Sequence, residues 1–134
     1  MVAWAYPRSG TPPSVLVADD NATWRDAVGE VLARAGFRPL EAADGEEVVR
    51  LVRRERVDLV LIDFHMPRLD GIQAVRMLRR EQRWQPAVLM TARPAEVPRD
   101  EVRALRIATV LAKPADRRVI VTTVSRVIRG EPPS

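Results

Sequence analysis

The sequence predicts an α/β fold: a five-stranded, doubly wound parallel sheet of strand order 2-1-3-4-5, with five helices. Short apolar runs, typical of strands buried on both faces, alternate along the chain with stretches of helical periodicity. Such alternation favours a parallel sheet with helices on both faces, joined by right-handed crossovers. Pro39 lies inside the second run and indicates an edge strand, because proline donates no ladder hydrogen bond. The 2-1-3-4-5 order places the second strand at an edge.

The first unit begins with the apolar run Ser14–Ala18, which stops at two aspartates. Asn21 or Thr23 can cap the helix that follows, since both side chains accept hydrogen bonds from backbone N–H groups. Apolar residues then recur at helical spacing, and Gly36 ends the helix.

The next two units repeat this pattern. Residues 37–42 form the second strand, and Asp44 starts the second helix. The run Leu59–Asp63 is the third strand, and it changes abruptly from apolar residues to an aspartate. Asp70 is the expected cap of the third helix.

The last two units are less regular. Ala87–Thr91 is the fourth strand, and two prolines confine the following helix to about residues 99–106. Thr109–Ala112 is the fifth strand, Asp116 caps the last helix, and Gly130 ends it. We therefore expect a domain over residues 14–130, a flexible arm over residues 1–13 and a polar tail over residues 131–134.

Composition narrows the class of protein. The chain has no cysteine, which excludes disulfides and thiolate metal sites, and no apolar run nears the roughly 18 residues of a membrane span. We expect a cytoplasmic location, since the amino-terminal residues do not resemble a signal peptide. The net charge of +4 reflects arginines that are dispersed along the chain, and most of them lie opposite the apolar stripe of a predicted helix. This placement favours solvated helix faces over a nucleic-acid surface. The arginines are Arg25, Arg34, Arg50, Arg53, Arg76, Arg79, Arg103, Arg117 and Arg126.

Polar residues follow four of the predicted strands. Asp19 and Asp20 follow the first strand, and Asp63, Thr91 and Lys113 end or follow the third, fourth and fifth. The carboxyl ends of parallel strands share one edge, where ligands bind. Crowded carboxylates need a cation, and oxygen ligands without cysteine favour Mg²⁺. Lys113, the only lysine among 22 basic residues, and the Thr91 hydroxyl suit phosphoryl oxygens, so Asp63 is a candidate nucleophile.

Each of these residues also has a purely structural interpretation. Asp19 and Asp20 could be charges at a helix N-terminus, Asp63 a loop cap, Thr91 an ordinary strand end, and Lys113 part of a turn before proline, where a cis bond is an option. Five such residues ending four strands at fitting intervals favour a site.

These residues resemble the receiver domain of two-component response regulators, over about residues 14–129. The run D-F-H-M-P-R-L-D-G around Asp63, the pair Asp19–Asp20, and the dipeptides Thr91–Ala92 and Lys113–Pro114 carry the resemblance. It implies a flavodoxin-like fold and a phosphoacceptor switch, not an enzyme beyond self-phosphorylation from small donors and self-dephosphorylation.

The resemblance also implies residue roles. Asp63 would accept a phosphoryl group from a sensor histidine kinase or a phosphotransfer protein. The side chains of Asp19, Asp20 and Asp63 with the backbone carbonyl of His65 would hold Mg²⁺, and the phosphoryl oxygens would be bound by Thr91, Ala92 and Lys113.

The chain departs from the family pattern in the region that normally transmits the signal. Val110 stands at the switch position, where the family usually has Tyr or Phe. Arg106 and Ile107 replace the usual Gly-Ala before the fifth strand, and Pro94 and Pro98 interrupt the start of the fourth helix. We therefore expect the phosphorylation chemistry to be retained and leave the output route open.

His65 and Arg93 occupy the positions that flank the approach of hydrolytic water in the family. Both side chains are large, and the hypothesis is that they lengthen the phosphate lifetime by screening water. The alternative is that both point to solvent.

Three functions compete. The leading one is a switch that alters a partner-binding surface, either alone or as the receiver piece of a longer protein. It would have an unidentified downstream protein partner, no direct DNA or membrane binding, and a homodimer left open. An aspartyl-phosphate phosphatase is disfavoured, because His65 replaces the second aspartate of those enzymes. The third is a receiver-like scaffold that no longer takes phosphate.

Overall fold

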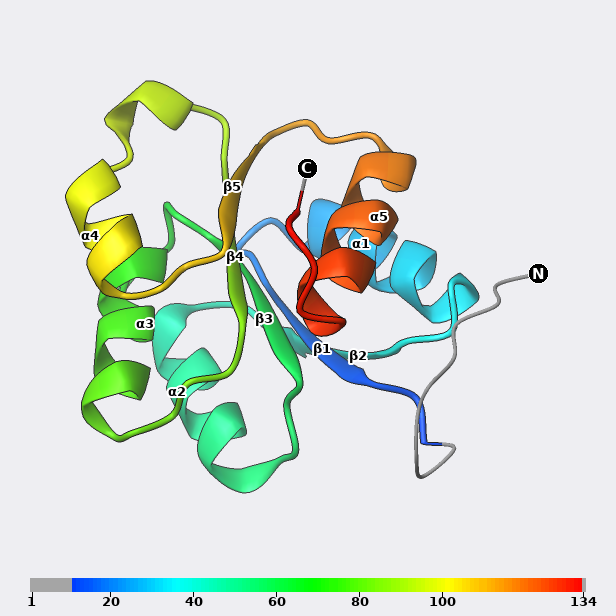
Figure 1. Ribbon diagram of the computed structural model, residues 1–134, viewed down its shortest axis with the longest axis horizontal. Helices are drawn as coiled ribbons and strands as arrows, with labels where there is room; N and C mark the ends of the chain where they lie inside the picture. The colour runs from blue at the N-terminus through cyan, green and yellow to red at the C-terminus, as the bar shows by residue number, and fades with distance from the viewer. Residues whose placement is uncertain (1–10, 134) are drawn as a thin grey trace.

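Five parallel strands lie side by side in the order β2-β1-β3-β4-β5 in the computed structural model, which describes residues 11–133 (Figure 1). This order confirms the prediction, with β2 at the edge. The strands are β1 (Ser14–Ala18), β2 (Arg38–Ala42), β3 (Leu59–Asp63), β4 (Ala87–Thr91) and β5 (Thr109–Ala112). The predicted second strand began one residue too early, because the Phe37 N–H still belongs to the preceding helix end and donates to the Leu32 carbonyl at 3.0 Å.

The helices are α1 (Ala22–Arg34), α2 (Gly45–Arg54), α3 (Gly71–Arg80), α4 (Arg99–Ala104) and α5 (Arg117–Ile128). A short 3₁₀ turn, η1 (Pro94–Glu96), precedes α4 and was not predicted. The fourth helix also ends two residues earlier than expected. Arg106 adopts a left-handed conformation with φ of 56°, and the Ile107 N–H donates to the Val102 carbonyl at 3.0 Å. This closing motif, which usually uses glycine, stops the helix.

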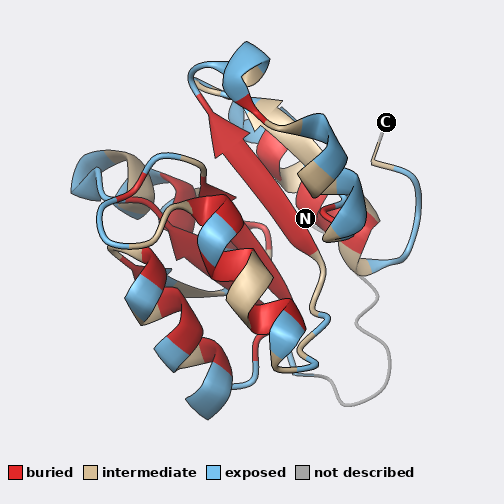
Figure 2. Ribbon diagram, turned by 90° about the vertical axis from the view of Figure 1, so that its left-hand side faces the viewer, coloured by how far each residue is buried: buried red, intermediate tan, exposed pale blue. Residues whose placement is uncertain are grey.

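Helices cover both faces of the sheet: α1 and α5 one face, α2, α3 and α4 the other (Figure 1). Successive strand side chains point to opposite faces, so each strand contributes to two cores. Leu16 and Ile62 pack with α2 and α3, whereas Val17 and Leu61 pack with α1 and α5. The strands β1, β3 and β4 are buried along their whole length, as Figure 2 shows for the strand residues drawn in red. Unbroken apolar runs were therefore the correct signal for these strands.

The structure confirms the predicted helix caps and decides between the two candidates for the cap of α1. Asn21, not Thr23, caps α1, because its side chain accepts the Trp24 N–H at 3.0 Å. Asp70 caps α3 in a reciprocal capping box with Gln73. Asp44 and Asp116 cap α2 and α5 as expected. These caps fix where the chain turns from each strand end into the next helix, and so fix the loops around the candidate site.

The start of α3 lies directly against the end of β3. A Cβ atom added at Gly71 would lie 2.5 Å from the carbonyl oxygen of Asp63 and 3.0 Å from the Leu89 side chain. Glycine is needed here for close backbone approach. The contact holds the strand end that carries Asp63 against the following helix.

The two predicted ends of the chain are described only in part. Residues 1–10 of the predicted arm and residue 134 of the predicted tail lie outside the described residues, so both remain predictions. Pro13 is buried, and its carbonyl accepts the Arg38 N–H at 2.9 Å. None of the helices between residues 11 and 133 is both long and apolar enough to cross a membrane.

Candidate functional site

Three carboxylates meet at the carboxyl edge of the sheet. Asp19 and Asp20 follow β1, and Asp63 ends the neighbouring β3, whose Ile62 is in register with Ala18. One oxygen from each carboxylate lies within 4.8 Å of the others. Asp19 and Asp63 are buried, with 0% and 5% exposure, whereas Asp20 is exposed. The predicted crowding of carboxylates is therefore present, with two of the three charges inside the protein.

Burial and, to a smaller extent, this crowding perturb the pKa of Asp63. Burial raises its pKa, the negative charge of Asp19 raises it further, and the nearby Lys113 ammonium opposes both. Asp20 adds a smaller upward effect, and a hydrogen bond from the His65 N–H a smaller downward one, so the pKa reaches about 6. Removal from water and a neighbouring like charge both disfavour the ionised form. A bound cation would act in the opposite direction.

The donor set suits Mg²⁺. Three carboxylates offer hard oxygen ligands within 4.8 Å of one another. Magnesium sites commonly use one or two protein carboxylates and keep other positions for water and phosphate oxygens. The residues present are therefore of the kind that can hold this ion.

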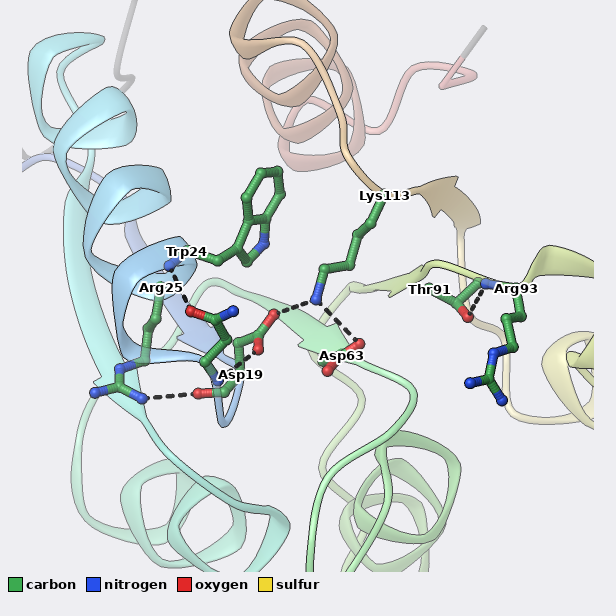
Figure 3. Close-up of polar contacts among 8 residues, drawn as sticks. Asp19, Trp24, Arg25, Asp63, Thr91, Arg93 and Lys113 are labelled. Carbon is green, nitrogen blue, oxygen red and sulfur yellow. Dashed lines mark hydrogen bonds and ion pairs between the residues drawn. The ribbon is translucent and has the colours of Figure 1, made fainter.

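Lys113 reaches into the cluster from the end of β5 (Figure 3). Its Nζ atom lies 2.7 Å from Asp19 Oδ2 and 3.6 Å from Asp63 Oδ1. Its backbone N–H donates to the Thr91 carbonyl at 2.8 Å, which extends the β4–β5 pairing past the last strand residue. The Lys113–Pro114 peptide is cis. The single lysine of the chain thus neutralises part of the acidic cluster from within.

Thr91 is fully buried at the end of β4, and Ala92 after it is exposed. The Thr91 Oγ1 atom accepts the Arg93 N–H at 2.9 Å (Figure 3). A hydroxyl that accepts one hydrogen bond keeps its own hydrogen for donation. Thr91 can therefore donate to an oxygen atom placed at this edge.

His65 and Arg93 come from different loops and meet on one carboxylate. His65 Nε2 lies 3.3 Å from Glu96 Oε1, and Arg93 Nη1 lies 3.5 Å from Glu96 Oε2. All three side chains are about half exposed or more. Glu96, on the unpredicted η1 turn, was missed because nothing local in the sequence links it to the β3–α3 loop.

The space beside the carboxylates is an open hollow of about 470 Å³. It is lined by the exposed Asp20 and by the β3–α3 loop with the start of α3: His65, Met66, Pro67, Asp70 and Gln73. Asp20 is the member of the acidic cluster that lines this hollow.

Two residues of α1 contact the site and were missed. Arg25 donates from Nη1 to the Asp19 carbonyl at 2.8 Å and from Nε to Glu41 at 2.9 Å, so it is not the solvated arginine that we expected. The Trp24 ring lies against Lys113, with Nζ 5.6 Å from the ring centroid. These contacts join residues far apart in the chain, so helical periodicity gives no signal for them.

Two residues that depart from the family pattern, Val110 and Arg106, contact other parts of the fold. Val110 is in register with Leu89 on β4 and is half-buried. It packs against the core between the sheet and helices α2, α3 and α4. Arg106 lies at the end of α4, and its guanidinium is 5.1 Å from the ring centroid of Trp84. The aliphatic Val110 offers no large ring that could swing between a buried and an exposed position.

Comparison with known proteins identifies relatives for most of the chain. A family model described as the response regulator receiver domain matches residues 15–125. The chain is 34% identical over 119 residues to the transcriptional regulatory protein AfsQ1 of Streptomyces coelicolor, which covers 87% of this chain and 52% of that protein. It is 30% identical to Protein PilH of Pseudomonas aeruginosa, covering 87% of this chain and 98% of PilH.

Solved structures agree with these relatives. The chemotaxis response regulator CheY4 of Vibrio cholerae matches with a TM-score of 0.79 and 27% identity, over 87% of this chain and 99% of CheY4. The receiver domain of the Francisella response regulator 1452 matches with a TM-score of 0.78 and 26% identity, over 88% and 98% of the two chains. The chain spans about half the length of AfsQ1 and of several other regulators that it matches.

Proposed function

The chain belongs to the family of response regulator receiver domains, and from that premise we propose that it is a phosphorylation-dependent switch in which Asp63 accepts a phosphoryl group. The observation that carries the proposal is the placement of Asp63: a buried carboxylate at the end of β3, beside Asp19 and 3.6 Å from the only lysine. The donor would be a sensor histidine kinase or a phosphotransfer protein.

The chemistry requires little of the protein beyond placement and charge. A carboxylate oxygen of Asp63 attacks phosphorus, the bond from phosphorus to the donor atom breaks, and the donor leaves with that electron pair. The product is an acyl phosphate. Asp19, Asp20 and Asp63 with the His65 carbonyl would hold Mg²⁺, which supplies neutralisation of the charge that spreads over the phosphoryl oxygens.

Lys113 and Thr91 are the proposed partners of the transferred group, together with the exposed residue Ala92. In the unphosphorylated protein Lys113 pairs with Asp19 at 2.7 Å, and Thr91 accepts a hydrogen bond from Arg93. A phosphoryl group on Asp63 adds negative charge and acceptor oxygens within reach of Lys113. The ammonium would then exchange Asp19 for the phosphoryl group, which is the local event of the switch.

The output follows from the exchange of contacts at this edge and would pass to a downstream protein. Val110 cannot act as an aromatic rotamer switch, so the signal would pass through the β4–α4 and β5–α5 loops that carry Thr91 and Lys113. His65 and Arg93, tied together by Glu96, would govern how long the phosphoryl group persists. Regulation of a longer protein that contains this domain is part of the proposal.

Incubation with Mg²⁺ and acetyl phosphate, followed by intact-mass measurement, tests the proposed function. A single phosphoryl adduct on the parent and on Asp26→Asn, but none on Asp63→Asn, is expected; Asp26 is exposed on α1 and is a matched control. Repeated turnover of phosphate esters would instead identify a phosphatase. No adduct and no response to beryllofluoride would leave a scaffold that does not take phosphate.

A further inference from the structure

Trp24 lies against the Lys113 ammonium at the centre of the site. It is in the first turn of α1, and its ring faces the Lys113 ammonium, with Nζ 5.6 Å from the ring centroid (Figure 3). The face of an indole attracts a cation within about 6 Å of its centroid, more strongly than the ring of Tyr or Phe does. Trp24 therefore interacts directly with the cation that neutralises the acidic cluster.

The indole is not held in place by a hydrogen bond of its own. Its Nε1 atom is buried, and within residues 11–133 it has no hydrogen-bond partner. A buried donor without a partner is unfavourable, so other contacts have to compensate for it. Those contacts are the packing against the core between the sheet and helices α1 and α5, and the contact with the Lys113 ammonium. The orientation of the ring and the position of the ammonium thus depend on each other.

The pair beneath the ring is mostly shielded from water. The Lys113 side chain is 18% exposed, and the Asp19 side chain is 0% exposed. Both Asp19 oxygens are engaged: Oδ1 accepts the Asn21 N–H at 2.9 Å, and Oδ2 accepts from Lys113 at 2.7 Å. A charge pair that is removed from water is stronger than an exposed one. Trp24 attracts the ammonium in the position in which it pairs with Asp19, and so favours that position.

We propose that Trp24 is a positioning residue that holds the Lys113 ammonium on Asp19, and that it thereby sets the affinity of the acidic site for Mg²⁺. The inference rests on the metal site of the proposed function and does not need phosphoryl transfer. Mg²⁺ on the three carboxylates repels an ammonium 2.7 Å from one of them, so the ammonium has to withdraw from Asp19 and from the ring. Binding of Mg²⁺ therefore requires Lys113 to give up its contacts with Asp19 and with the ring. The contact with Trp24 thus lowers the affinity of the site for Mg²⁺.

Substitution of Trp24 measures this effect. We expect Trp24→Leu to bind Mg²⁺ about 2- to 30-fold more tightly than the parent in calorimetric titrations, the range of one cation–π contact. Trp24→Phe keeps an aromatic face of weaker attraction and should fall between the two. Trp84→Leu is the control, because Trp84 is exposed and lies in the α3–β4 loop, at the opposite edge of the sheet. Its affinity should equal that of the parent.

A double-mutant cycle with Lys113→Met tests whether Trp24 acts through the ammonium. Removing Lys113 should abolish the difference between Trp24 and leucine at position 24. An equal difference in the presence and absence of Lys113 would overturn the proposal, since the effect would then be a general loosening of α1. Equal Mg²⁺ affinities of the parent, Trp24→Leu and Trp24→Phe would also overturn it.

Fluorescence gives a readout that keeps Trp24 intact. In the Trp4→Phe/Trp84→Phe variant, Trp24 is the only tryptophan. Its emission should change as Mg²⁺ is added and saturate with the calorimetric affinity, because the cation leaves the ring. Unchanged emission at saturating Mg²⁺ would contradict the proposal. Failure of the acetyl phosphate experiment would remove the proposed function and leave these binding results unaffected.

Discussion

Lys113 is paired with Asp19, with 2.7 Å between Nζ and Oδ2, although their strands β5 and β1 are not neighbours in the sheet. The long side chain crosses the carboxyl ends of the strands between them to reach the most buried carboxylate. The site therefore contains its own counter-ion, the Lys113 ammonium. A metal ion has to compete with this ammonium for the carboxylates, whereas a phosphoryl group can bind it.

The buried Asp63 carboxylate should lower the stability of the fold at neutral pH. Its pKa is raised to about 6 in the folded state from 3.8, so between these values the folded protein binds more protons than the unfolded chain. Stability from this group is full below pH 3.8 and is lost as the pH rises through 6. In metal-free buffer, Asp63→Asn should gain up to about 3 kcal/mol over the parent at pH 7.5, and nothing at pH 3.5. Urea unfolding at both pH values measures it. Asp26→Asn should gain at neither, and a pH-independent gain in Asp63→Asn would contradict the assignment.

Mg²⁺ should stabilise the folded protein. An ion that binds only the folded state raises stability in proportion to the logarithm of its concentration above Kd. The Tm of the parent should rise with added Mg²⁺ in thermal unfolding, and the rise should be smaller in Asp20→Asn. Asp20 is the exposed member of the carboxylate cluster, so this substitution leaves the buried charges in place. Equal rises in the parent and Asp20→Asn would exclude Asp20 from the metal site.

The phosphate lifetime should depend on the pair of side chains joined by Glu96. His65 and Arg93 both contact this carboxylate, at 3.3 and 3.5 Å; His65 follows Asp63 at the end of β3, and Arg93 follows the neighbouring strand β4. The variant His65→Ala/Arg93→Ala removes both, so water reaches the acyl phosphate more easily, and its phosphate half-life should be several-fold shorter. Decay of the adduct after removal of acetyl phosphate measures this. Arg99→Ala, exposed on α4, is the control, and an equal or longer half-life in the double variant would refute the screening role.

The buried Arg79 should be a large contributor to stability. Its guanidinium donates to three backbone carbonyls, those of Leu105, Arg83 and Gln85, at 2.8, 3.0 and 2.9 Å. Burial, with a smaller effect of a neighbouring arginine, lowers its pKa. Arg79→Met leaves three acceptors without their donor and should cost about 2–4 kcal/mol in urea unfolding. Arg80→Met, an exposed neighbour, should cost little; equal costs would contradict the contribution of these hydrogen bonds.

Gly71 should not tolerate even a methyl group. An added Cβ would lie 2.5 Å from the Asp63 carbonyl oxygen, so Gly71→Ala should cost about 1–3 kcal/mol through overpacking. Gly29→Ala is the matched control: its Cβ would meet the nearest atom at 3.4 Å in the middle of a helix, where alanine is preferred to glycine. It should be neutral or stabilising in the same unfolding assay. Equal destabilisation by both substitutions would contradict the close approach of α3 to β3.

The order of elements was predictable because its signals are local. Apolar runs that stop at Asp63 or Thr91 mark strands that are buried on both faces and end at one edge. Pro39 fixed the edge strand, and the 2-1-3-4-5 order then brought Asp19 beside Asp63. The acidic cluster follows from topology alone, without knowledge of side-chain packing.

The contacts around the site that join distant parts of the chain were not predictable, since they depend on tertiary packing. Trp24 reaches across to Lys113, and Glu96 reaches from η1 to His65. Arg79 stands near the end of a helix, where an arginine is usually solvated. The loops that follow α3 and α4 nevertheless enclose its guanidinium. The left-handed conformation of Arg106 was likewise not predictable, because glycine is the residue that usually adopts it and an arginine gives no signal for it.

The most direct test of the central claim is to locate the phosphoryl group on the chain. After incubation with Mg²⁺ and acetyl phosphate, borohydride reduces an acyl phosphate to the alcohol and releases phosphate, so an aspartyl phosphate becomes homoserine. Peptide mass spectrometry should find this conversion at Asp63 and at no other carboxylate. Conversion at Asp19 or Asp20 instead, or none in a protein that binds Mg²⁺, would contradict the assignment of Asp63 as the acceptor.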